Sequence, residues 1–472
     1  MSVIAFLVGL LATITAANDD LQSRSFVTRD DTEFVISRIS SGRDTSQVAL
    51  SDLKITENVV NLTIVSDGVN SLSSKFVQAM RRSGTSRAGG VTAGTTPLEN
   101  VEGGSVFLAE VVVGGQDFSV VVDTGSSDPW LIVNNYKCYD VQGKPRNQKY
   151  CNFGPAYNPS SSTTYRQITD QNFNISYADG ETLGGDMGYE TFGMAGIQVP
   201  NQQFGLVDVA AWYGDGISSG LVGFAYRTLT SNYAGTDSTK DTKGSTLLYN
   251  PLFVNMYTNE SVDPVFSLAI DRDPNVGGVL AIGGIPDIRI SPMWITTPIH
   301  AMQVNQTDGT PVYEYYTIYI SGYAISNSTS TQFNPYDTQN RLKVPLVANN
   351  TNTIVDSGTS LIYVPNNVAS SVAEAFNPPA TWDGSNMYYY VACNATAPVF
   401  GVGITQKVFY VNPEDMIVQI GSNTCVSVVQ PNLSGLSILG SAWMKNVLAV
   451  FDIGSEQMRF AAREFYSSTA SG

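Results

Sequence analysis

The sequence predicts an all-β protein built from two related lobes. The chain has 472 residues, and its 43% hydrophobic content is enough to bury more than one core. Only 14% of the residues are charged, and helical periodicity is sparse beside many Gly, Ser, Thr, Val and Tyr residues, which favours short strands and turns. A short signature also occurs twice, at Val121 to Ser127 and at Ile354 to Ser360, which indicates a duplicated unit.

The chain begins with an apolar run from Val3 to Leu11, followed by the small residues Thr15, Ala16 and Ala17. This is the layout of a secretory signal peptide, and it assigns residues 1–17 to that segment. The alternative is a membrane anchor, although the run is too short to span a bilayer. No later apolar run reaches about twenty residues, and the C-terminal residues lack the hydrophobic tail of a lipid-anchor signal. We therefore expect no membrane association and a secreted protein, with the vacuole as the other destination.

The segment from Asn18 to Gly90 differs from the rest of the chain in its charge. It contains nine basic and nine acidic residues, so the net charge of −16 comes from the later residues. Arg81 and Arg82 form a dibasic pair within a Gly/Ser-rich stretch, which predicts a propeptide over residues 18–90 that is removed near this pair. The alternative is a small N-terminal domain. The acidic body argues against nucleic acid or an anionic membrane as a partner and suits an acidic medium.

The cysteines and the glycosylation sequons also indicate an exported protein. Pairing Cys138 with Cys151 and Cys393 with Cys425 gives one disulfide in each half of the chain. The alternatives are four buried thiols or a zinc site, which would need closer spacing. Eight Asn-X-Ser/Thr sequons, the acceptor sites for N-linked glycans, suit a glycosylated product. They begin at Asn61, Asn174, Asn259, Asn305, Asn327, Asn349, Asn394 and Asn432.

Both copies of the signature are predicted to lie at strand ends. Residues 118–123 form an apolar run into a Thr-Gly-Ser turn, and residues 360–364 continue as a strand from the second turn. Leu221-Val222-Gly223 and Ile438-Leu439-Gly440 follow the two signatures at similar distances, and a Gly there would let one backbone pass closely against another. Helices are predicted after Pro365, up to Pro378, and around residues 247–257.

From about Pro97 to Ala462 the chain resembles the pepsin-like aspartic endopeptidases of the secreted, fungal type. The resemblance rests on both Asp-Thr/Ser-Gly signatures, Trp130, Tyr177 with Gly180, Phe266-Ser-Leu, Gly283-Gly284 and Ile438-Leu-Gly. It implies a bilobal all-β fold in which two related six-stranded-type lobes flank a central cleft. Residues 91–285 would form the N-terminal catalytic lobe with its flap, and residues 286–472 the C-terminal catalytic lobe. Protein and peptide substrates would bind to a monomer.

The resemblance makes Asp123 and Asp356 the catalytic pair, one from each lobe. Two neighbouring carboxylates share one proton, because ionising both is costly. The ionised acid would take a proton from a water molecule while the protonated acid donates to the scissile carbonyl oxygen, giving a gem-diol at acidic pH. This chemistry needs no metal and no cofactor.

The resemblance also assigns support to the residues that follow the acids, which are Thr124, Gly125, Ser126, Ser357, Gly358 and Thr359. The hydroxyls of Ser126 and Thr359 would bond the outer carboxylate oxygens. Those of Thr124 and Ser357 would lock the two loops together, and the glycines permit the tight turns. Alternatively, these hydroxyls would only form hydrogen bonds with polar groups of their own turns.

Residues 175–180 match the flap of the family. Tyr177 would cover the bound peptide and bond the indole N–H of Trp130, although a Tyr in a hairpin can also serve packing alone. Gly180 belongs to the same motif, and Glu181 stands where the family often has a small residue. The resemblance to fungal members implies that Asp179, two residues beyond Tyr177, would pair with a substrate Lys before the scissile bond. Without that pairing, large apolar residues are expected on both sides of the bond.

Competing interpretations can be weighed from the residues. The single histidine, His300, cannot supply a two-histidine zinc site or a serine-protease triad, and a surface or structural role is expected for it. A catalytically silent binding or inhibitor protein would usually lack an acid, a signature Gly or the flap Tyr, and all are present. A two-carboxylate glycosidase is disfavoured by the duplicated turns.

In the precursor, Lys54 or Lys75 is expected to pair with the two acids.

Overall fold

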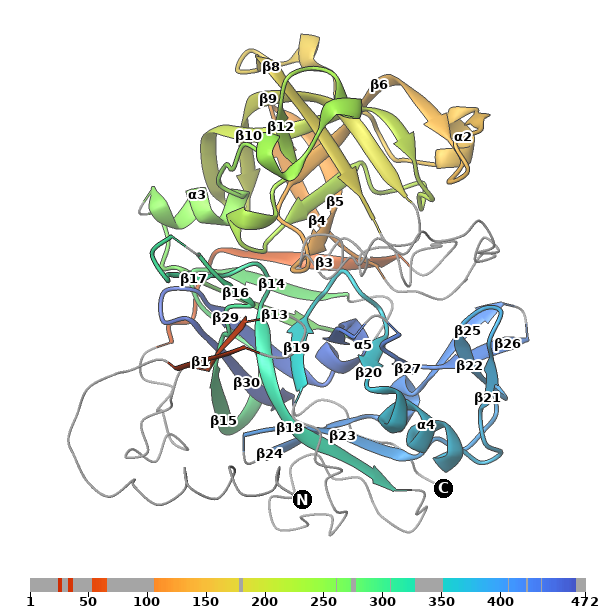
Figure 1. Ribbon diagram of the computed structural model, residues 1–472. Coiled ribbons are helices and arrows are strands. Elements are labelled where there is room, and N and C mark those ends of the chain that lie inside the picture. Colours follow the sequence, from red (N-terminus) through yellow and green to blue (C-terminus); the bar gives the residue numbers. More distant parts are fainter. Residues whose placement is uncertain are drawn as a thin grey trace, which may run out of the picture.

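The computed structural model describes residues 24–27, 33–36, 53–65, 106–177, 181–259, 261–272, 277–305, 307–326, 351–405, 407–421, 423–433 and 435–463. Strands dominate these residues, which confirms the all-β prediction. Figure 1 shows two lobes, one above the other, with strand β3 (Val59–Val65) crossing between them.

The N-terminal lobe is formed by the strands between residues 106 and 234. They are β4 (Val106–Val113), β5 (Gln116–Asp123), β6 (Pro129–Tyr139), β7 (Pro145–Arg146), β8 (Arg166–Ser176), β9 (Thr182–Met194), β10 (Ile197–Ala211), β11 (Gly220–Gly223) and β12 (Asn232–Ala234). Hydrogen bonding orders this part of the sheet as β12-β8-β9-β10-β6-β11-β5-β4, with β7 paired to β6. The short helix α2 (Gln148–Cys151) lies beside β6.

A central group of strands joins the two lobes. The sheet continues from β4 through β3 to β14 (Gly278–Ile282), β13 (Val265–Ile270), β29 (Val447–Asp452), β30 (Gln457–Arg463) and β15 (Ile290–Pro298). Strands from distant parts of the sequence therefore share one sheet. The predicted division at residues 285 and 286 falls between β14 and β15 of this group and remains a prediction.

The C-terminal lobe contains a seven-stranded and a four-stranded sheet. The larger has β24 (Lys407–Val411), β23 (Val399–Ile404), β18 (Thr317–Ser326), β19 (Thr351–Val355), β28 (Ser437–Leu439), β20 (Ile362–Val364) and β27 (Val429–Pro431) in that order. The smaller has β21 (Thr381–Asp383), β22 (Tyr388–Val391), β26 (Thr424–Ser427) and β25 (Ile417–Gly421). Two hairpins stand apart, β1 (Arg24–Val27) with β2 (Glu33–Ile36) and β16 (Gln303–Val304) with β17 (Pro311–Val312).

Both predicted helices are present. Helix α4 (Asn366–Ala375) begins after Pro365 and buries Val368 and Val372, as its spacing predicts. Helix α3 (Leu252–Thr258) begins later than predicted, because Pro251 occupies its N-cap and proline disfavours helical geometry in the residue before it. The other short helix, α5 (Ser441–Met444), follows β28.

The predicted duplication appears as the same three-strand unit in each lobe. Strand β11 lies parallel to β5 and antiparallel to β6, and β28 lies parallel to β19 and antiparallel to β20. A Cβ on Gly223 would lie 2.5 Å from Ser126 O, and a Cβ on Gly440 would lie 2.2 Å from Leu361 O. Glycine is therefore required in both units for the close backbone approach.

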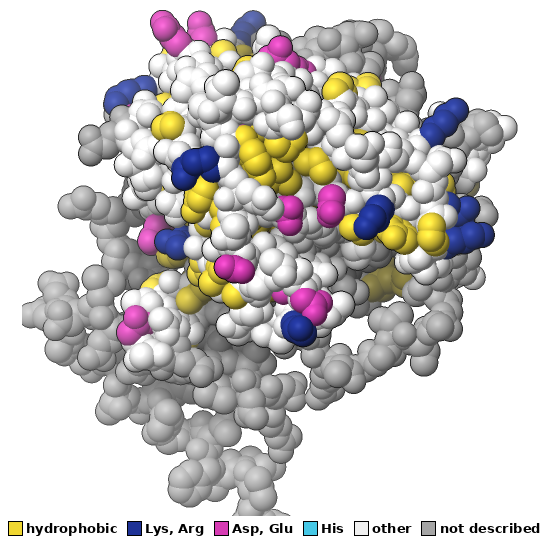
Figure 2. All heavy atoms as spheres, turned by 90° about the horizontal axis from the view of Figure 1, so that it is seen from above, with side chains coloured by type: hydrophobic (Ala, Val, Ile, Leu, Met, Phe, Trp, Pro, Cys, Tyr) yellow, Lys and Arg dark blue, Asp and Glu magenta, His cyan; other side chains and the backbone are white. Residues whose placement is uncertain are grey.

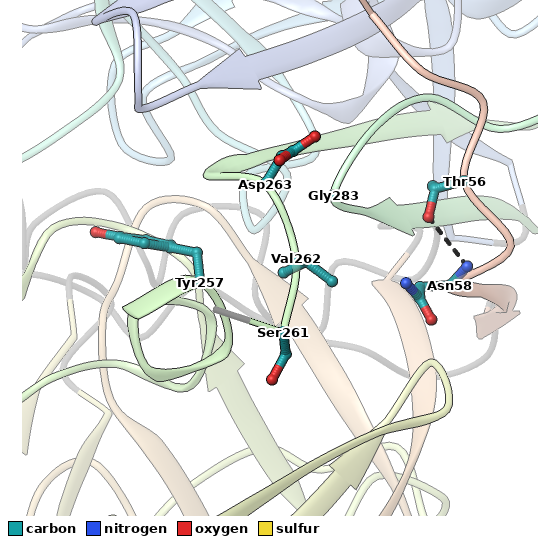
Figure 3. Close-up of a pocket in the computed structure, with 7 residues that line it drawn as sticks. All are labelled: Thr56, Asn58, Tyr257, Ser261, Val262, Asp263 and Gly283. Atoms are coloured by element: carbon teal, nitrogen blue, oxygen red, sulfur yellow. Dashed lines mark hydrogen bonds between the residues drawn. The ribbon is translucent and has the colours of Figure 1, made fainter. Parts of the chain in front are cut away.

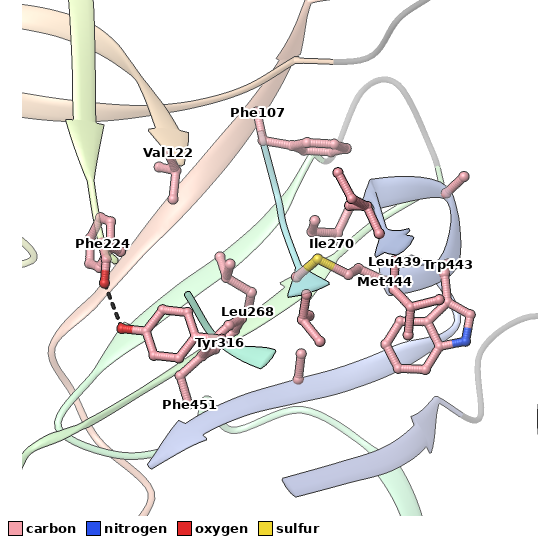
Figure 4. Packing of buried hydrophobic residues seen from close by; sticks show 14 of the residues in the cluster. Phe107, Val122, Phe224, Leu268, Ile270, Tyr316, Leu439, Trp443, Met444 and Phe451 are labelled. Atoms are coloured by element: carbon pink, nitrogen blue, oxygen red, sulfur yellow. Dashed lines mark hydrogen bonds between the residues drawn. The ribbon is translucent and has the colours of Figure 1, made fainter. Parts of the chain in front are cut away.

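A continuous hydrophobic core connects the central strands with the C-terminal lobe (Figure 4). Phe266 is fully buried and stacks on Phe451 at a centroid distance of 4.5 Å, with Phe253 edge-on at 4.9 Å. The Tyr316 hydroxyl donates to Phe224 O over 2.5 Å, so this polar atom is satisfied inside the core. Aromatic rings from both lobes thus meet in one packed cluster.

The segment 53–65, which precedes the dibasic pair, is integrated into the body. Strand β3 pairs antiparallel with β14 on one side and with β4 on the other, and Leu62 is buried in the main core. Upstream of β3, Thr56 and Asn58 line a cavity of about 440 Å³ opposite Tyr257, Asp263 and other residues of the body (Figure 3). Arg81 and Arg82 lie outside the described residues.

Both predicted disulfides are present. Cys138 and Cys151 join the end of β6 to α2, and Cys393 and Cys425 join the β22 region to β26. Each bridge closes a loop within one lobe, so neither one connects the lobes. No free cysteine occurs in the described part of the chain.

Glu190 on β9 is buried in the N-terminal lobe and accepts hydrogen bonds from three hydroxyls. Burial by itself would raise the pKa of Glu190, but the hydroxyls of Ser162, Thr164 and Tyr157 donate to its carboxylate and hold the pKa below its usual value. Because the pKa of Glu190 is lower in the folded than in the unfolded state, its ionisation contributes to the stability of the fold. This contribution is fully present at pH values above the unfolded-state pKa, and it is lost as the pH falls through the folded-state pKa.

We therefore expect Glu190→Gln to lower the melting temperature strongly near pH 6 and much less near pH 3. These two pH values lie on either side of the usual Glu pKa of about 4.3. Thermal unfolding of wild type and variant across this range checks the expectation. Glu110→Gln, on an exposed position of β4, is the matched control and should show no such trend. Equal destabilisation by Glu190→Gln at both pH values would contradict the electrostatic explanation.

Candidate active site

The two signature turns hold their acids by the same backbone contact. Asp123 ends β5, and Asp356 directly follows β19. The N–H of Gly125 donates to Asp123 Oδ1 over 2.9 Å, and the N–H of Gly358 donates to Asp356 Oδ1 over 2.8 Å. The duplicated sequence therefore produces duplicated geometry around the inner oxygen of each carboxylate.

The second oxygen of each carboxylate accepts from a hydroxyl three residues later. Ser126 Oγ donates to Asp123 Oδ2, and Thr359 Oγ1 donates to Asp356 Oδ2 over 2.6 Å. Both acids are almost entirely shielded, with Asp123 at 0% and Asp356 at 2% exposure. Each carboxylate is fixed in one orientation by two donors before any substrate binds.

The two acids come together because Gly125 lacks a side chain. A Cβ built on Gly125 would lie 2.6 Å from Cγ of Asp356 and 2.6–2.7 Å from its carboxylate oxygens. The second acid therefore lies directly against the turn that carries the first one. Any larger residue at position 125 would collide with Asp356, so this glycine is needed for the juxtaposition as well as for the turn.

A reciprocal set of hydrogen bonds joins the two turns across the lobes. Thr124 Oγ1 donates to Val355 O over 3.1 Å and accepts from the N–H of Ser357 over 2.9 Å. Ser357 Oγ donates to Val122 O over 2.9 Å and accepts from the N–H of Thr124 over 3.1 Å. Each hydroxyl thus satisfies two backbone groups of the opposite turn.

Removing one of these hydroxyls is expected to loosen the pair of turns. Ser357→Ala leaves the Thr124 N–H and the Val122 carbonyl without this partner, and we expect a loss of about 1–3 kcal/mol for a buried group left unsatisfied. The free energy of unfolding and kcat/KM for a peptide both measure the effect. Ser357→Thr is the control, because it keeps the hydroxyl and matches the residue in the first turn. Wild-type stability of Ser357→Ala would contradict the expectation.

The flap residue Tyr177 lies against the first turn. Its hydroxyl accepts from Trp130 Nε1 over 3.1 Å, and its N–H closes the β8–β9 hairpin by donating to Glu181 O over 2.8 Å. Burial, and then the charge of Asp123, raise the pKa of the Tyr177 phenol well above its usual value. Asp179 and Gly180 lie outside the described residues.

The sequence analysis did not single out Trp212, which the structure places beside the flap. Its ring centroid lies 5.4 Å from those of both Trp130 and Tyr177, and it stacks on Phe153 at 5.9 Å. Trp212 follows the end of β10, and no short-range pattern relates it to residues 35 and 82 positions earlier. Only the pairing of β10 with β6 and β9 brings these rings together.

Glu181 and Asp128 are further buried carboxylates near this site. The N–H of Tyr213 donates to Glu181 Oε1 over 2.8 Å, which ties the flap hairpin to the segment after β10. Asp128 Oδ1 accepts from Tyr249 Oη over 2.7 Å and from the N–H of Ser231 over 2.8 Å. Both carboxylates therefore anchor backbone segments around Tyr177.

Of the two candidates for pairing with the two acids, Lys54 and Lys75, the structure contradicts Lys54. Its ammonium group instead forms an exposed ion pair with Asp263, with 2.8 Å between Nζ and Oδ2. Segment 53–58 follows the edge of β14 and the 282–285 turn, which directs Lys54 toward Asp263. Lys75, the other candidate, lies outside the described residues.

His300 is partly buried, and burial lowers the pKa of its imidazole. Its backbone N–H donates to Thr317 O.

The described residues contain no group of three or more His, Cys, Asp or Glu side chains that could hold a metal ion. Among their helices, none is long and apolar enough to cross a membrane. On the face in Figure 2, Lys and Arg side chains are scattered among Asp and Glu and form no continuous basic surface.

Comparison with known proteins decides the family. A family model described as eukaryotic aspartyl protease matches residues 106–463, which include both signature turns and the flap hairpin. The chain belongs to this family. It is an aspartic-type endopeptidase, and the family implies protein or peptide substrates.

Individual aspartic proteases match over most of their length. A probable aspartic-type endopeptidase of Aspergillus fumigatus is 38% identical over 425 residues, which cover 87% of this chain and 89% of that relative. Rhizopuspepsin-4 of Rhizopus niveus is 28% identical over 384 residues, covering 79% of this chain and 81% of that relative. Secreted aspartic protease 3 of Candida albicans is 25% identical over 384 residues, with 79% and 84% coverage.

The fold of this endopeptidase also has a match among solved structures. The crystal structure of an aspartic proteinase from Irpex lacteus superposes with a TM-score of 0.56 and covers 77% of this chain and 96% of that one. The two sequences are 16% identical, so this match concerns the fold alone. It agrees with the bilobal all-β architecture predicted from the sequence.

Proposed function

We propose that the protein is a secreted endopeptidase that cleaves peptide bonds at acidic pH, with Asp123 and Asp356 as its catalytic acids. The observation that carries this proposal is the matched fixation of the two carboxylates, with Asp356 lying against Gly125 of the opposite turn. Two acids in such proximity favour a state in which one proton is shared. At one pH, the ionised carboxylate can then act as the general base and the protonated carboxyl group as the general acid.

In the proposed mechanism, the ionised carboxylate removes a proton from a water molecule held between the acids. The protonated carboxyl donates to the carbonyl oxygen as the water attacks, and the gem-diol collapses when the leaving amine is protonated. Ser126 and Thr359 bind the outer oxygens, so each carboxylate keeps its orientation while protons move. Tyr177 would close over the peptide from the flap.

The test is hydrolysis of an acid-denatured protein by the processed enzyme between pH 2 and 7, with and without pepstatin. The proposal expects an acidic optimum and loss of cleavage with the inhibitor. Absence of cleavage after verified processing would instead favour a catalytically silent binding or inhibitor protein. Cleavage unaffected by pepstatin would exclude the two-acid site as its source.

Secretion and processing belong to the same proposal. Residues 1–17 would act as the signal peptide and residues 18–90 as a propeptide, with residues 91–285 and 286–472 as the two catalytic lobes of a monomer. Secreted aspartic protease 3 of Candida albicans, a relative, supports export. The apolar N-terminal run and the two disulfides support it independently.

Asp179 extends the proposal to substrate choice. A carboxylate two residues beyond Tyr177 would pair with the ammonium of a Lys that precedes the scissile bond. We expect wild type to cleave peptides with Lys or Leu at that position, and Asp179→Ser to lose the Lys peptide selectively. The ratio of kcat/KM for the two peptides measures this. An unchanged ratio in Asp179→Ser would rule out the pairing.

A further inference from the structure

The Asn-X-Ser/Thr sequons of the described residues fall into two structural groups. Six of the eight have their asparagine in the described part of the chain, and Asn327 and Asn349 do not. The groups differ in the exposure of the asparagine and in what its side-chain nitrogen contacts. This nitrogen is the atom that receives an N-linked sugar.

In the first group, both the asparagine and the hydroxyl residue two positions later are exposed. The pairs are Asn61 with Thr63, Asn259 with Ser261, Asn305 with Thr307, and Asn394 with Thr396. Three of these pairs lie in loops or turns, where a large substituent can extend into solvent.

The local geometry of the first group leaves room for a sugar. Asn259 caps the end of α3, and Ser261 lines the open cavity of about 440 Å³ shown in Figure 3. Asn305 lies in the β16–β17 loop and uses its side-chain oxygen, which accepts from the N–H of Thr307 over 2.9 Å. This contact occupies the oxygen and not the nitrogen.

Asn61 is the one member of this group that lies within a strand. It occupies the exposed face of β3, opposite Val279 of β14, while its neighbour Leu62 points into the core. Side chains alternate between the faces of a strand, so a sugar on Asn61 would project away from the core. The backbone pairing of β3 would be unaffected.

In the second group, the side-chain nitrogen is already bound within the fold. Asn174 Nδ2 donates to Asp241 Oδ2 over 2.8 Å and to Ser238 O over 3.3 Å. Asn432 Nδ2 donates to Ser437 Oγ over 2.8 Å. Both asparagines are only partly exposed. A sugar on Asn174 would leave one N–H for two acceptors, so one of these polar groups would lose its partner. A sugar on Asn432 would have to fit beside Ser437 Oγ, which lies 2.8 Å from the nitrogen on a residue that is 1% exposed.

We infer that Asn61, Asn259, Asn305 and Asn394 carry N-linked oligosaccharides and that Asn174 and Asn432 do not. In this reaction the amide nitrogen forms a bond to C1 of an oligosaccharide carried on a lipid diphosphate. The bond from C1 to the diphosphate oxygen breaks, the amide loses one proton, and the lipid diphosphate leaves. The inference rests on the proposed secretion, because the lipid-linked donor is met on the export route.

The test is glycopeptide mapping of the full-length chain secreted from a eukaryotic host. Asp356→Asn combined with Arg81→Gln and Arg82→Gln is used, so that neither self-cleavage nor cleavage at the dibasic pair removes Asn61 from the chain. An amidase that releases the glycan converts each occupied asparagine to aspartate, which mass spectrometry assigns to its position. Hydrolysis by the wild-type enzyme with and without pepstatin is measured separately, so failure of the inference is distinguishable from failure of the proposed activity.

We expect conversion at all four exposed asparagines and none at Asn174 or Asn432. Single Asn→Gln variants at the four positions should each remove one glycan from the intact mass, and these exposed substitutions should leave secretion unchanged. Glycan at Asn174 or Asn432, or a bare asparagine at any of the four positions, would overturn the inference. A secreted chain without any glycan would overturn it as well.

Discussion

Asp123→Asn and Asp356→Asn are each expected to abolish peptide hydrolysis. Either change removes one member of the acid pair, so a base and an acid can no longer act on the same water. Loss of general acid–base catalysis typically costs about 10²–10⁴-fold in rate, and a larger loss is expected where both roles depend on the pair. The measurement is kcat/KM for a peptide at the acidic optimum.

The controls for this prediction separate chemistry from folding. Asparagine keeps the oxygen that accepts from Gly125 or Gly358, so both variants should retain the folded structure. Asp170→Asn, at an exposed position of β8, is the matched control and should retain full activity, because it creates no Asn-X-Ser/Thr sequon. If either active-site variant kept activity within about threefold of wild type, which is under 0.7 kcal/mol, the two-acid mechanism would be wrong.

Phe266→Ala is expected to cause the largest loss of stability from a single core residue. Phe266 lies in the central β13, fully buried, with rings of Phe224, Phe253, Tyr316 and Phe451 around it at centroid distances of 4.5–5.8 Å. Removing a buried Phe side chain costs about 3–5 kcal/mol, from lost burial and from the cavity left behind. The shift in the midpoint of chemical unfolding measures it.

This measurement is best made on the Asp356→Asn background, because self-digestion would otherwise remove the unfolded chain. Phe266→Leu is the first control and should cost much less, since it keeps most of the apolar volume. Leu248→Ala is the second, because Leu248 is 46% exposed and surface changes typically stay within about 0.5 kcal/mol. A loss below 1 kcal/mol for Phe266→Ala would show that the cluster collapses without penalty.

The position of the predicted propeptide in the fold affects how the active enzyme should be prepared. Strand β3 lies between β4 and β14 although it precedes the dibasic pair Arg81–Arg82. Preparations used for the activity tests therefore need their N-terminus determined, so that hydrolysis is compared between chains processed at the same position.

Local sequence patterns were sufficient for much of the fold and of the candidate site. An apolar run ending in Asp-Thr-Gly predicts β5 and its turn, and apolar spacing after Pro365 predicts α4. The two disulfide pairs also follow from their order in the chain. These features depend on residues that are close in sequence, so propensity and spacing decide them.

The tertiary structure alone decided which distant residues meet. The approach of Asp356 to Gly125, the contacts of Trp212 with Trp130 and Tyr177, and the ion pair of Lys54 with Asp263 all join residues far apart in the chain. So does the place of β3 in the central sheet. Such contacts depend on strand order and register across the whole sheet, which no local pattern specifies. The sequence determined the chemical groups, and the fold determined their neighbours.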